Sequence, residues 1–327
     1  MVKMKIGKVA FVLTAILQAF GLSSCKSKKE IVGIIQFGSH ESLNACRLGI
    51  EDGLRKSGIN LDRYDIRRFD SDFQTDLSFL QAKELVESGA KLVVAIATPA
   101  ALQAAKACDG TGIPVVYCAV TDSSKLDGFD NCTGTSDIPD YEAQMELIYE
   151  FMGRKDGLRI GTLMSMNEPS DLVQLKSFRE EADKYGASIV GLSVLNPNSI
   201  RLQTRSLITF GVDCMMNLLD SSVVSRLDAI LDVADAAGIP VFGSDVEQVE
   251  SGCLASASLD YHSVGECAGE QAAKILKGCK VSEVPHRIIE KQSKPYYNSG
   301  KFESFDPASV SFPGSIRVIE DVCGLAL

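Results

Sequence analysis

Residues 31–59 read IVGIIQFGSHESLNACRLGIEDGLRKSGI, and this stretch decides the fold. Ile31 to Phe37 form an almost unbroken apolar run, which is typical of a strand buried on both faces. Residues 43–57 then place apolar side chains at helical spacing, and Gly58 ends the helix. A buried strand that runs directly into an amphipathic helix is the repeating unit of a parallel α/β sheet.

The same unit recurs as far as residue 119. We predict further strands near residues 64–69, 91–97 and 114–119, with helices at 77–88 and 99–107 between them. Parallel strands joined by helices need right-handed crossovers, which place helices on both faces of the sheet. The first half of the chain is therefore predicted to be a doubly wound parallel sheet.

The pattern restarts after a helix predicted at 139–152. Strands are expected at 158–164, 188–194, 212–217 and 240–243, and helices at 172–185, 200–209 and 221–237. About 300 residues follow the apolar leader, which is the length of two ordinary domains. We predict an α/β protein of two lobes, each a doubly wound parallel sheet.

Residues 1–24 are typical of an export signal. Lysines at positions 3, 5 and 8 precede an apolar run over residues 9–20, which is too short to span a bilayer because a spanning helix needs roughly 20 residues. The sequence LSSC at 22–25 resembles the lipobox of bacterial lipoproteins. That resemblance implies acylation of Cys25, a tether at 25–30, and a chain anchored to a bacterial membrane that faces the periplasm or the exterior. A plain signal peptide with an incidental cysteine is the alternative.

Composition excludes some partners and cofactors. The chain has 33 basic and 43 acidic residues and no basic stripe, so we expect no nucleic-acid partner. Nine of its ten cysteines remain after the lipidation site, and nine cannot all pair within one chain. None stands at C-x-x-C spacing and there are only three histidines, so we expect neither a zinc centre nor a redox dithiol. Most of these cysteines are expected to be small buried hydrophobic side chains.

Polar residues follow the predicted strands, at the edge where open parallel sheets bind ligands. Thr98 is a candidate N-cap and Pro99 suits the first helical position, so the free N–H groups of that turn can bind a carboxylate. Aspartates end strands in both halves and suit an ammonium group, so the set favours a zwitterion such as an amino acid. Each residue could instead be only a helix start, a turn or a cap. The strand-end residues are Gln36, His40, Thr98, Thr121, Asp122, Asn167, Glu168, Asp220 and Asp245.

Several stretches together resemble one family. They are IVGIIQFGSHESLNACRLGIEDGLRKSGI (31–59), VVAIATPAA (93–101), IPVVYCAVTD (113–122), GTSDI (134–138), IPVFGSD (239–245) and LDYHSVGECAGEQAAKILKG (259–278). The chain resembles the ABC-transporter substrate-binding lipoproteins of the tryptophan/tyrosine type over nearly its whole length after the leader. The resemblance implies a type I periplasmic-binding fold, in which two lobes joined by three hinge strands close over a small molecule. It also implies a monomer that hands the molecule to a membrane permease with a cytoplasmic ATPase.

The resemblance further implies a set of ligand-facing residues and lobe boundaries. The hinge would cross near Asp137, Leu259 and Pro285, which assigns 31–137 and 259–284 to lobe 1 and 138–258 and 285–327 to lobe 2. The chain departs from the family pattern at Met164-Ser165 and at residues 217–219, which shape the pocket. The ligand-facing residues carried over are Gln36, His40, Thr98, Pro99, Ala100, Thr121, Asp122, Asp220 and Asp245.

Two other functions remain open. The sequence contains no G-x-S-x-G motif, no phosphate-binding G-x-x-x-x-G-K-[ST] loop and no H-E-x-x-H motif, so nothing in it supports an enzyme, a cofactor or a metal. A carboxylate pair across a cleft can still do acid–base chemistry. A lipid-anchored sensor that presents its closed form to a receptor would use the same fold. We expect a solute-binding protein that is not an enzyme.

Overall fold

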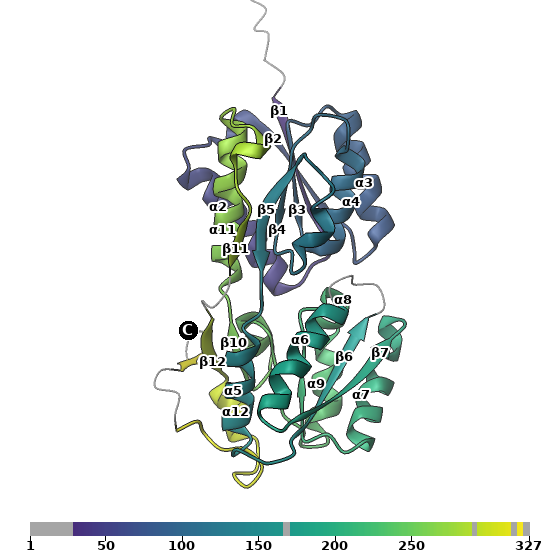
Figure 1. Ribbon diagram of the computed structural model, residues 1–327, viewed down its shortest axis with the longest axis vertical. Helices are drawn as coiled ribbons and strands as arrows, with labels where there is room; N and C mark the ends of the chain where they lie inside the picture. Colours follow the sequence, from purple (N-terminus) through teal and green to yellow (C-terminus); the bar gives the residue numbers. More distant parts are fainter. Residues whose placement is uncertain (1–28, 166–170, 290–292, 315–318, 323–327) are drawn as a thin grey trace, which may run out of the picture.

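The computed structural model describes residues 29–165, 171–289, 293–314 and 319–322, which form two α/β lobes placed along the long axis of the molecule (Figure 1). The predicted fold class is confirmed, because each lobe is built on a parallel sheet packed between helices. The leader and Cys25 lie outside the described residues. Within the described ranges, no helix combines the length and the apolar character needed to span a bilayer.

The first lobe contains a six-stranded sheet whose neighbouring strands are all parallel, in the order β11-β5-β4-β3-β1-β2. Helices α2 (Glu41–Lys56) and α11 (Tyr261–Leu276) cover one face, and α3 (Thr75–Glu87) and α4 (Thr98–Cys108) cover the other (Figure 1). Strands β3 and β4 are buried throughout, as their continuous apolar sequence predicts. The strands are β1 (Glu30–Gln36), β2 (Tyr64–Asp70), β3 (Leu92–Ile96), β4 (Val115–Cys118), β5 (Cys132–Asp137) and β11 (Arg287–Ile289).

The second lobe joins a parallel sheet to a short antiparallel edge. The parallel sheet has the order β7-β6-β8-β9, and a second sheet has the order β10-β12-β13 with β10 antiparallel to β12. The N–H of Leu254 donates to the carbonyl of Val241 at 2.7 Å, so β10 lies beside β9. The sheet that we predicted to be wholly parallel is therefore mixed at its edge. The strands are β6 (Arg159–Ser165), β7 (Ser188–Val194), β8 (Cys214–Met216), β9 (Val241–Phe242), β10 (Ala255–Ser258), β12 (Lys294–Tyr297) and β13 (Glu320–Asp321).

The single helix predicted at 221–237 is two helices in the structure. Arg226 leaves the helical conformation, with φ −124° and ψ 25°, and the hydroxyl of Ser225 donates to the carbonyl of Ser222 at 2.8 Å. A serine side chain that bonds to the backbone competes with the helical hydrogen-bond ladder, which ends the first helix here. The helices of this lobe are α5 (Tyr141–Phe151), α6 (Asp171–Lys184), α7 (Ile200–Thr209), α8 (Ser221–Val224), α9 (Leu227–Asp235), α10 (Val246–Glu250) and α12 (Ser299–Glu303).

The chain crosses between the lobes three times: after β5, after β10, and between β11 and β12. Strand β5 of the first sheet ends at Asp137 and leads into α5 of the second lobe, and β10 leads back through Leu259 into α11. Residues 287–289, which we assigned to the second lobe, pair with β5 as strand β11. The first lobe therefore extends to Ile289 instead of ending before Pro285. The other lobe boundaries remain predictions.

Helices α2 and α11 touch along their backbones, because glycines meet where they cross. A Cβ atom added to Gly49 would lie 2.1 Å from the carbonyl oxygen of His262, and one added to Gly265 would lie 2.2 Å from that of Cys46. Gly53 and Gly269 make equally close contacts one turn further on. These helices begin at the carboxyl edge of the first sheet, so the crossing also determines where their first turns lie.

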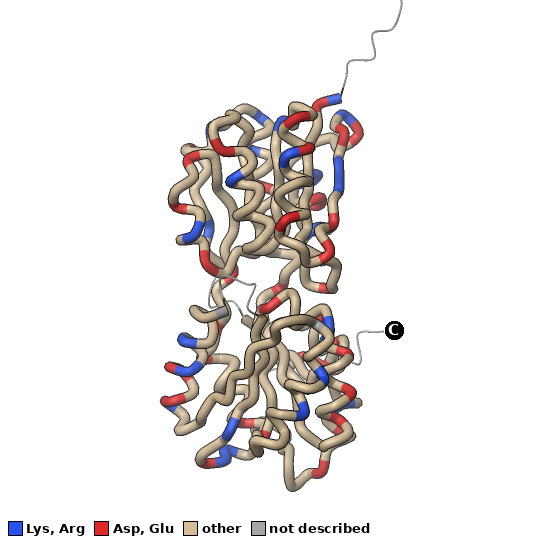
Figure 2. The backbone as a smooth tube through the Cα atoms, turned by 90° about the vertical axis from the view of Figure 1, so that its right-hand side faces the viewer, with Lys and Arg blue, Asp and Glu red and all other residues tan. Residues whose placement is uncertain are grey.

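The described cysteines are free thiols, and most of them are buried as predicted. Burial raises the pKa of the Cys108 thiol to about 11, so this thiol is inert at neutral pH. Cys323 lies outside the described residues. Basic and acidic residues are interspersed along both lobes (Figure 2). The described cysteines are Cys46, Cys108, Cys118, Cys132, Cys214, Cys253, Cys267 and Cys279.

Candidate functional site

A cavity between the lobes is formed where helices begin after strands. Helices α2, α4 and α11 of the first lobe and α8 and α10 of the second all follow strands and present their first turns or N-caps to it. Its volume is about 30 Å³, which leaves room for only a few water molecules, so the lobes are nearly closed on each other. It is lined by His40, Ser42, Leu43, Ala97, Thr98, Ala119, Thr121, Asp137, Leu219, Asp220, Ser221, Val224, Asp245 and Tyr261.

Asp245 links the two lobes. The hydroxyl of Ser42 in α2 donates to its Oδ2 at 2.8 Å, across the cavity. Asp245 is also the N-cap of α10, where it accepts from the backbone N–H and the side-chain amide of Gln248, both at 2.8 Å. Burial raises the pKa of Asp245 above its ordinary value. This aspartate thus contributes to closure of the lobes and begins a helix of the second lobe.

Asp137 is the buried carboxylate at the hinge end of β5. It accepts a hydrogen bond from the Tyr261 hydroxyl at 2.7 Å and a longer one from Thr121 Oγ1 at 3.4 Å. Burial outweighs these bonds and raises the pKa of Asp137 to about 6, and the nearby charge of Asp245 acts in the same direction. A cation placed beside Asp137 would favour its ionised form.

Asp220 caps α8 from the second-lobe side of the cavity. Its Oδ1 accepts from the backbone N–H groups of Ser222 and Val223, and its Oδ2 accepts from the N–H of Ser165 at the end of β6. These bonds hold α8 and β6 together at the cavity wall. Asp220 is therefore a helix cap, which is one of the two roles that the sequence allowed for it.

The first turn of α4 offers backbone donors to the cavity. Ala97 is the N-cap, with φ 76° and ψ 154°, a conformation that costs a non-glycine residue about 1–3 kcal/mol. Thr98, which we predicted as the N-cap, is the first helical residue instead, because the turn occurs one residue earlier. Among the described residues, no acceptor contacts the N–H of Thr98 or Ala100. Free N–H groups of a first helical turn attract a carboxylate.

His40 precedes α2 with both ring nitrogens buried and unpartnered among the described residues. Burial lowers its pKa to about 4, so the ring is neutral at pH 7. The ring stacks on Phe73 with the two planes 6° apart and the centroids at 6.2 Å. Neither ring nitrogen of His40 forms a hydrogen bond with a hydroxyl of the described residues.

The structure brings only part of the predicted site together. Gln36 is buried, and its side-chain amide donates to the carbonyl of Gly38 and to the side-chain oxygen of Asn44. Pro99 and Ala100 are buried within α4. Asp122 caps a short turn by accepting from the N–H of Ser124. None of these four lines the cavity. Asn167 and Glu168 lie outside the described residues. The predicted residues that line the cavity are His40, Thr98, Thr121, Asp220 and Asp245.

The prediction missed several residues that line the cavity. Ser42 comes from the first turn of α2, and Tyr261 comes from the first residue of α11, some 200 positions away in the sequence. Asp137 was predicted only as a hinge crossing. Two signals in the sequence were available. The polar end of β5 pointed to Asp137, and the N-cap Asp260 directly precedes Tyr261.

The cavity is negative and lacks a basic side chain. Among the residues that the structure describes, its charged lining residues are Asp137, Asp220 and Asp245, and no lysine or arginine lines it. A ligand ammonium group can therefore face a carboxylate, whereas a ligand carboxylate can bind only to hydroxyls and to backbone N–H groups. This is the arrangement expected for a zwitterion.

The comparisons with known proteins agree with this geometry. The family model described as ABC transporter substrate binding protein matches residues 31–305. A protein of Clostridioides difficile named tyrosine-binding protein is 28% identical over 297 residues, which cover 87% of this chain and 83% of that protein. The L-Trp complex of an ABC domain from Streptococcus pneumonia has a TM-score of 0.81 and 29% identity, covering 88% of this chain and 97% of that one.

A third comparison concerns the fold alone. The ligand-free, open structure of a substrate-binding protein with adhesive properties from Clostridium difficile is 24% identical, with a TM-score of 0.63. It covers 89% of this chain and 99% of its own. The same two-lobed fold thus occurs in structures described as ligand-bound and as open.

Proposed function

This chain belongs to the ABC transporter substrate-binding protein family, and from that premise we propose that its interlobe cavity binds a zwitterionic amino acid of the aromatic class. The chain is the extracytoplasmic solute-binding component of an ABC transporter. The observation that carries the ligand proposal is the cavity itself, in which buried carboxylates face a free helix N-terminus and no basic side chain of the described ranges is present.

The ligand ammonium group is assigned to Asp137. Asp137 has one well-formed side-chain hydrogen bond, to Tyr261, and a long one to Thr121, whereas Asp220 and Asp245 are engaged in capping helices. Burial raises the pKa of Asp137, and an ammonium group beside it would compensate the buried charge. The ligand carboxylate is assigned to the first turn of α4, where the N–H of Thr98 is available at the cavity.

The aromatic class rests on the relatives. One relative is named a tyrosine-binding protein, and a solved one contains L-Trp. In this chain the apolar lining residues Leu43, Leu219 and Val224 provide a surface for a hydrophobic side chain. Leu219 belongs to the segment that departs from the family pattern, so this residue bears on which aromatic side chain fits.

Binding acts by hinge closure. In this structure Ser42 contacts Asp245 and the cavity has room for only a few water molecules, so the lobes separate to admit the ligand and then close around it, with three carboxylates facing the enclosed space. Like charges in such a space repel, so closure without a cation is opposed, and a ligand that touches both lobes shifts the population toward the closed form. We propose that the closed form is what the permease and its ATPase recognise, and that the chain acts as a monomer without catalysing a reaction.

Binding of the free amino acid tests the proposal directly. Denaturation of the purified protein should release a co-purified small molecule that mass spectrometry identifies as an aromatic amino acid. Calorimetry on stripped protein should then detect binding of L-tyrosine or L-tryptophan, but not of 3-(4-hydroxyphenyl)propionate, which differs from tyrosine only in lacking the ammonium group. Equal affinity for the amino acid and its deaminated analogue would contradict the assignment of the ligand ammonium group to Asp137.

A lipid anchor at Cys25 is part of the same proposal. Its support is the sequence of the leader, with an apolar run and a lipobox-like LSSC at residues 22–25. Cys25→Ser should move the protein from the membrane fraction into the soluble fraction, because an acylated cysteine holds it at the bilayer. Fractionation followed by immunoblotting measures this. A Cys279→Ser variant, which changes an exposed thiol far from the leader, should stay at the membrane.

A further inference from the structure

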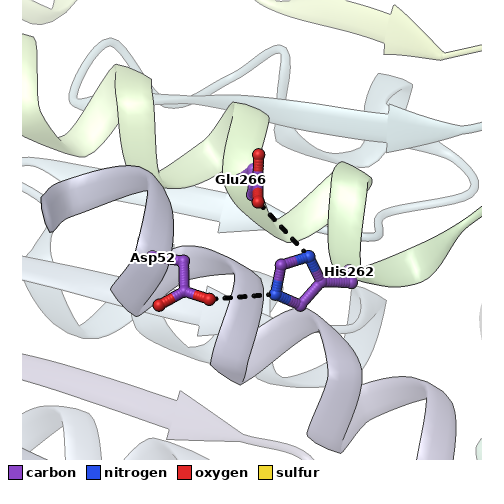
Figure 3. Close-up of side chains that lie close together, drawn as sticks. All are labelled: Asp52, His262 and Glu266. Atoms are coloured by element: carbon purple, nitrogen blue, oxygen red, sulfur yellow. Dashed lines mark hydrogen bonds and ion pairs between the residues drawn. The ribbon is translucent and has the colours of Figure 1, made fainter. Parts of the chain in front are cut away.

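A second cluster of chemistry-bearing side chains lies on the first lobe, where α2 and α11 cross. Asp52 comes from α2, and His262 and Glu266 lie one turn apart on α11 (Figure 3). None of the three lines the interlobe cavity, and all three are partly exposed. One ligand atom from each lies within 4.8 Å of the others.

The glycine contacts explain why so short a side chain as aspartate reaches across the two helices. Gly49 packs against the backbone of His262, and Gly53 packs against the backbone of Glu266. Asp52 stands between these two contact points on α2. The helices are therefore held at backbone contact where the three side chains meet, and the cluster is set by rigid elements 210 residues apart in the sequence.

The imidazole of His262 lies between two carboxylates. Its Nε2 is 3.2 Å from Asp52 Oδ2, and its Nδ1 is 3.4 Å from Glu266 Oε1 (Figure 3). A neutral imidazole has one N–H, so it can donate to only one of the two carboxylates. The other ring nitrogen then directs its lone pair toward a carboxylate, which is an arrangement of two ligand atoms that a metal ion can bridge, whereas a protonated ring would donate to both carboxylates.

The neighbouring cations do not fill that position. Arg55 Nη1 contacts Asp52 Oδ1 at 2.8 Å, on the opposite oxygen from the one that faces His262. Lys56 Nζ contacts Glu266 Oε1, on the Nδ1 side of the ring. The space between His262 Nε2 and Asp52 Oδ2 has a nitrogen ligand on one side and an oxygen ligand on the other.

We propose that His262 Nε2 and Asp52 Oδ2 bind a divalent transition-metal ion of the Zn²⁺ class, with Glu266 accepting the Nδ1–H of the same ring. Zn–N and Zn–O bonds of about 2.0–2.1 Å at a tetrahedral angle place two ligand atoms roughly 3.3 Å apart, close to the separation found here. A carboxylate on the second ring nitrogen is the usual partner of a metal-binding histidine. Water molecules complete the coordination, since the cluster is open to solvent.

The sequence alone did not predict this site, and the reason is physical. We expected no metal because the chain lacks closely spaced cysteine and histidine pairs. His262 and Glu266 are one helical turn apart, but Asp52 joins them only because four glycines bring α2 against α11. Zinc bound here would link two segments of the chain, so it should also stabilise the first lobe.

The test is Zn²⁺ binding to the full chain, measured by competition with a chromophoric chelator. His262→Ala and Asp52→Asn should each abolish binding, and Glu266→Gln should weaken it about 10- to 100-fold. Glu270→Gln changes the next carboxylate along α11, which pairs with Arg287, and should leave Zn²⁺ binding unchanged. Zn²⁺ should raise the thermal midpoint of the wild-type chain but not of His262→Ala.

Two results would overturn the proposal. One is Zn²⁺ binding that is equal in the wild-type chain and in His262→Ala. The other is the absence of Zn²⁺ binding to the wild-type chain. L-Tyrosine binding, measured in parallel on each variant, keeps this outcome separate from the proposed function of the cavity.

Discussion

Asp137→Asn is expected to weaken binding of the aromatic amino acid by about a hundredfold, because it removes the buried charge that faces the ligand ammonium group. Asparagine keeps the size of the side chain and can still accept from the Tyr261 hydroxyl, which now donates at 2.7 Å. Loss of the charge is therefore separated from loss of packing. A hundredfold change corresponds to about 2.7 kcal/mol, within the range of about 2–5 kcal/mol for truncating one partner of a buried, hydrogen-bonded charge pair in a complex.

A matched control for this variant is Asp122→Asn. Asp122 also follows a strand of the first sheet, but it caps a short turn and does not line the cavity. Its replacement should leave the affinity unchanged, as calorimetry would show. Asp245→Ala should weaken binding at least tenfold, because it removes the carboxylate that joins the lobes through Ser42. If Asp137→Asn binds like the wild type, the ammonium group does not lie at Asp137.

The pH dependence of ligand affinity provides a second test of the role of Asp137. The folded pKa of Asp137 is raised to about 6, above the ordinary value of about 3.9. The ligand ammonium group needs the ionised form, so affinity should fall as the pH drops below 6 and level off above it. In Asp137→Asn this loss between pH 6 and pH 5 should disappear.

Stability of the unliganded protein should change in the opposite sense. Because the folded state binds the Asp137 proton more tightly than the unfolded state does, stability falls as the pH rises from about 4 to 6 and is constant above. Two pKa units correspond to at most about 3 kcal/mol. Glu247, whose pKa is raised to about 9 by burial, extends the trend to higher pH, so the contribution of Asp137 is read as the difference between wild type and Asp137→Asn.

Gly265→Ala is expected to destabilise the first lobe by about 3 kcal/mol, the upper part of the range for overpacking. Its Cβ atom would lie 2.2 Å from the carbonyl oxygen of Cys46, a backbone atom that cannot move without shifting α2. Alanine is the better helix former by about 1 kcal/mol, so any loss of stability shows that the contact outweighs propensity. Differential scanning calorimetry should show the thermal midpoint of this lobe lowered by roughly 6–12 °C.

Gly128→Ala is the matched control for this helix contact. No atom lies within 4 Å of its added Cβ, and its φ is not in the left-handed region, so we expect a change within about 0.5 kcal/mol. Because α2 and α11 carry Ser42 and Tyr261 to the cavity, Gly265→Ala should also weaken ligand binding. If Gly265→Ala has the same thermal midpoint as the wild type, the helices α2 and α11 are not in backbone contact.

The elements that could be predicted are those with a strong local pattern. Strands β1, β3 and β4 are continuous apolar runs, and α2 follows β1 with apolar residues at helical spacing and a glycine after its end, so periodicity was enough. Strands β5 and β10 read CTGTSD and ASAS, and these polar segments carry no apolar signal although the structure buries them almost entirely. Their burial follows from their place in the connections between the lobes.

The order of the residues thus dictated that strands and helices alternate, that helices begin where parallel strands end, and that the fold is two-lobed, since each of these depends on neighbours in the chain. Which side chains share the cavity was set by packing. Ser42, Asp137, Asp245 and Tyr261 meet because two glycine-lined helices touch and two lobes close, and contacts between distant segments depend on shape and distance in space that no local pattern encodes.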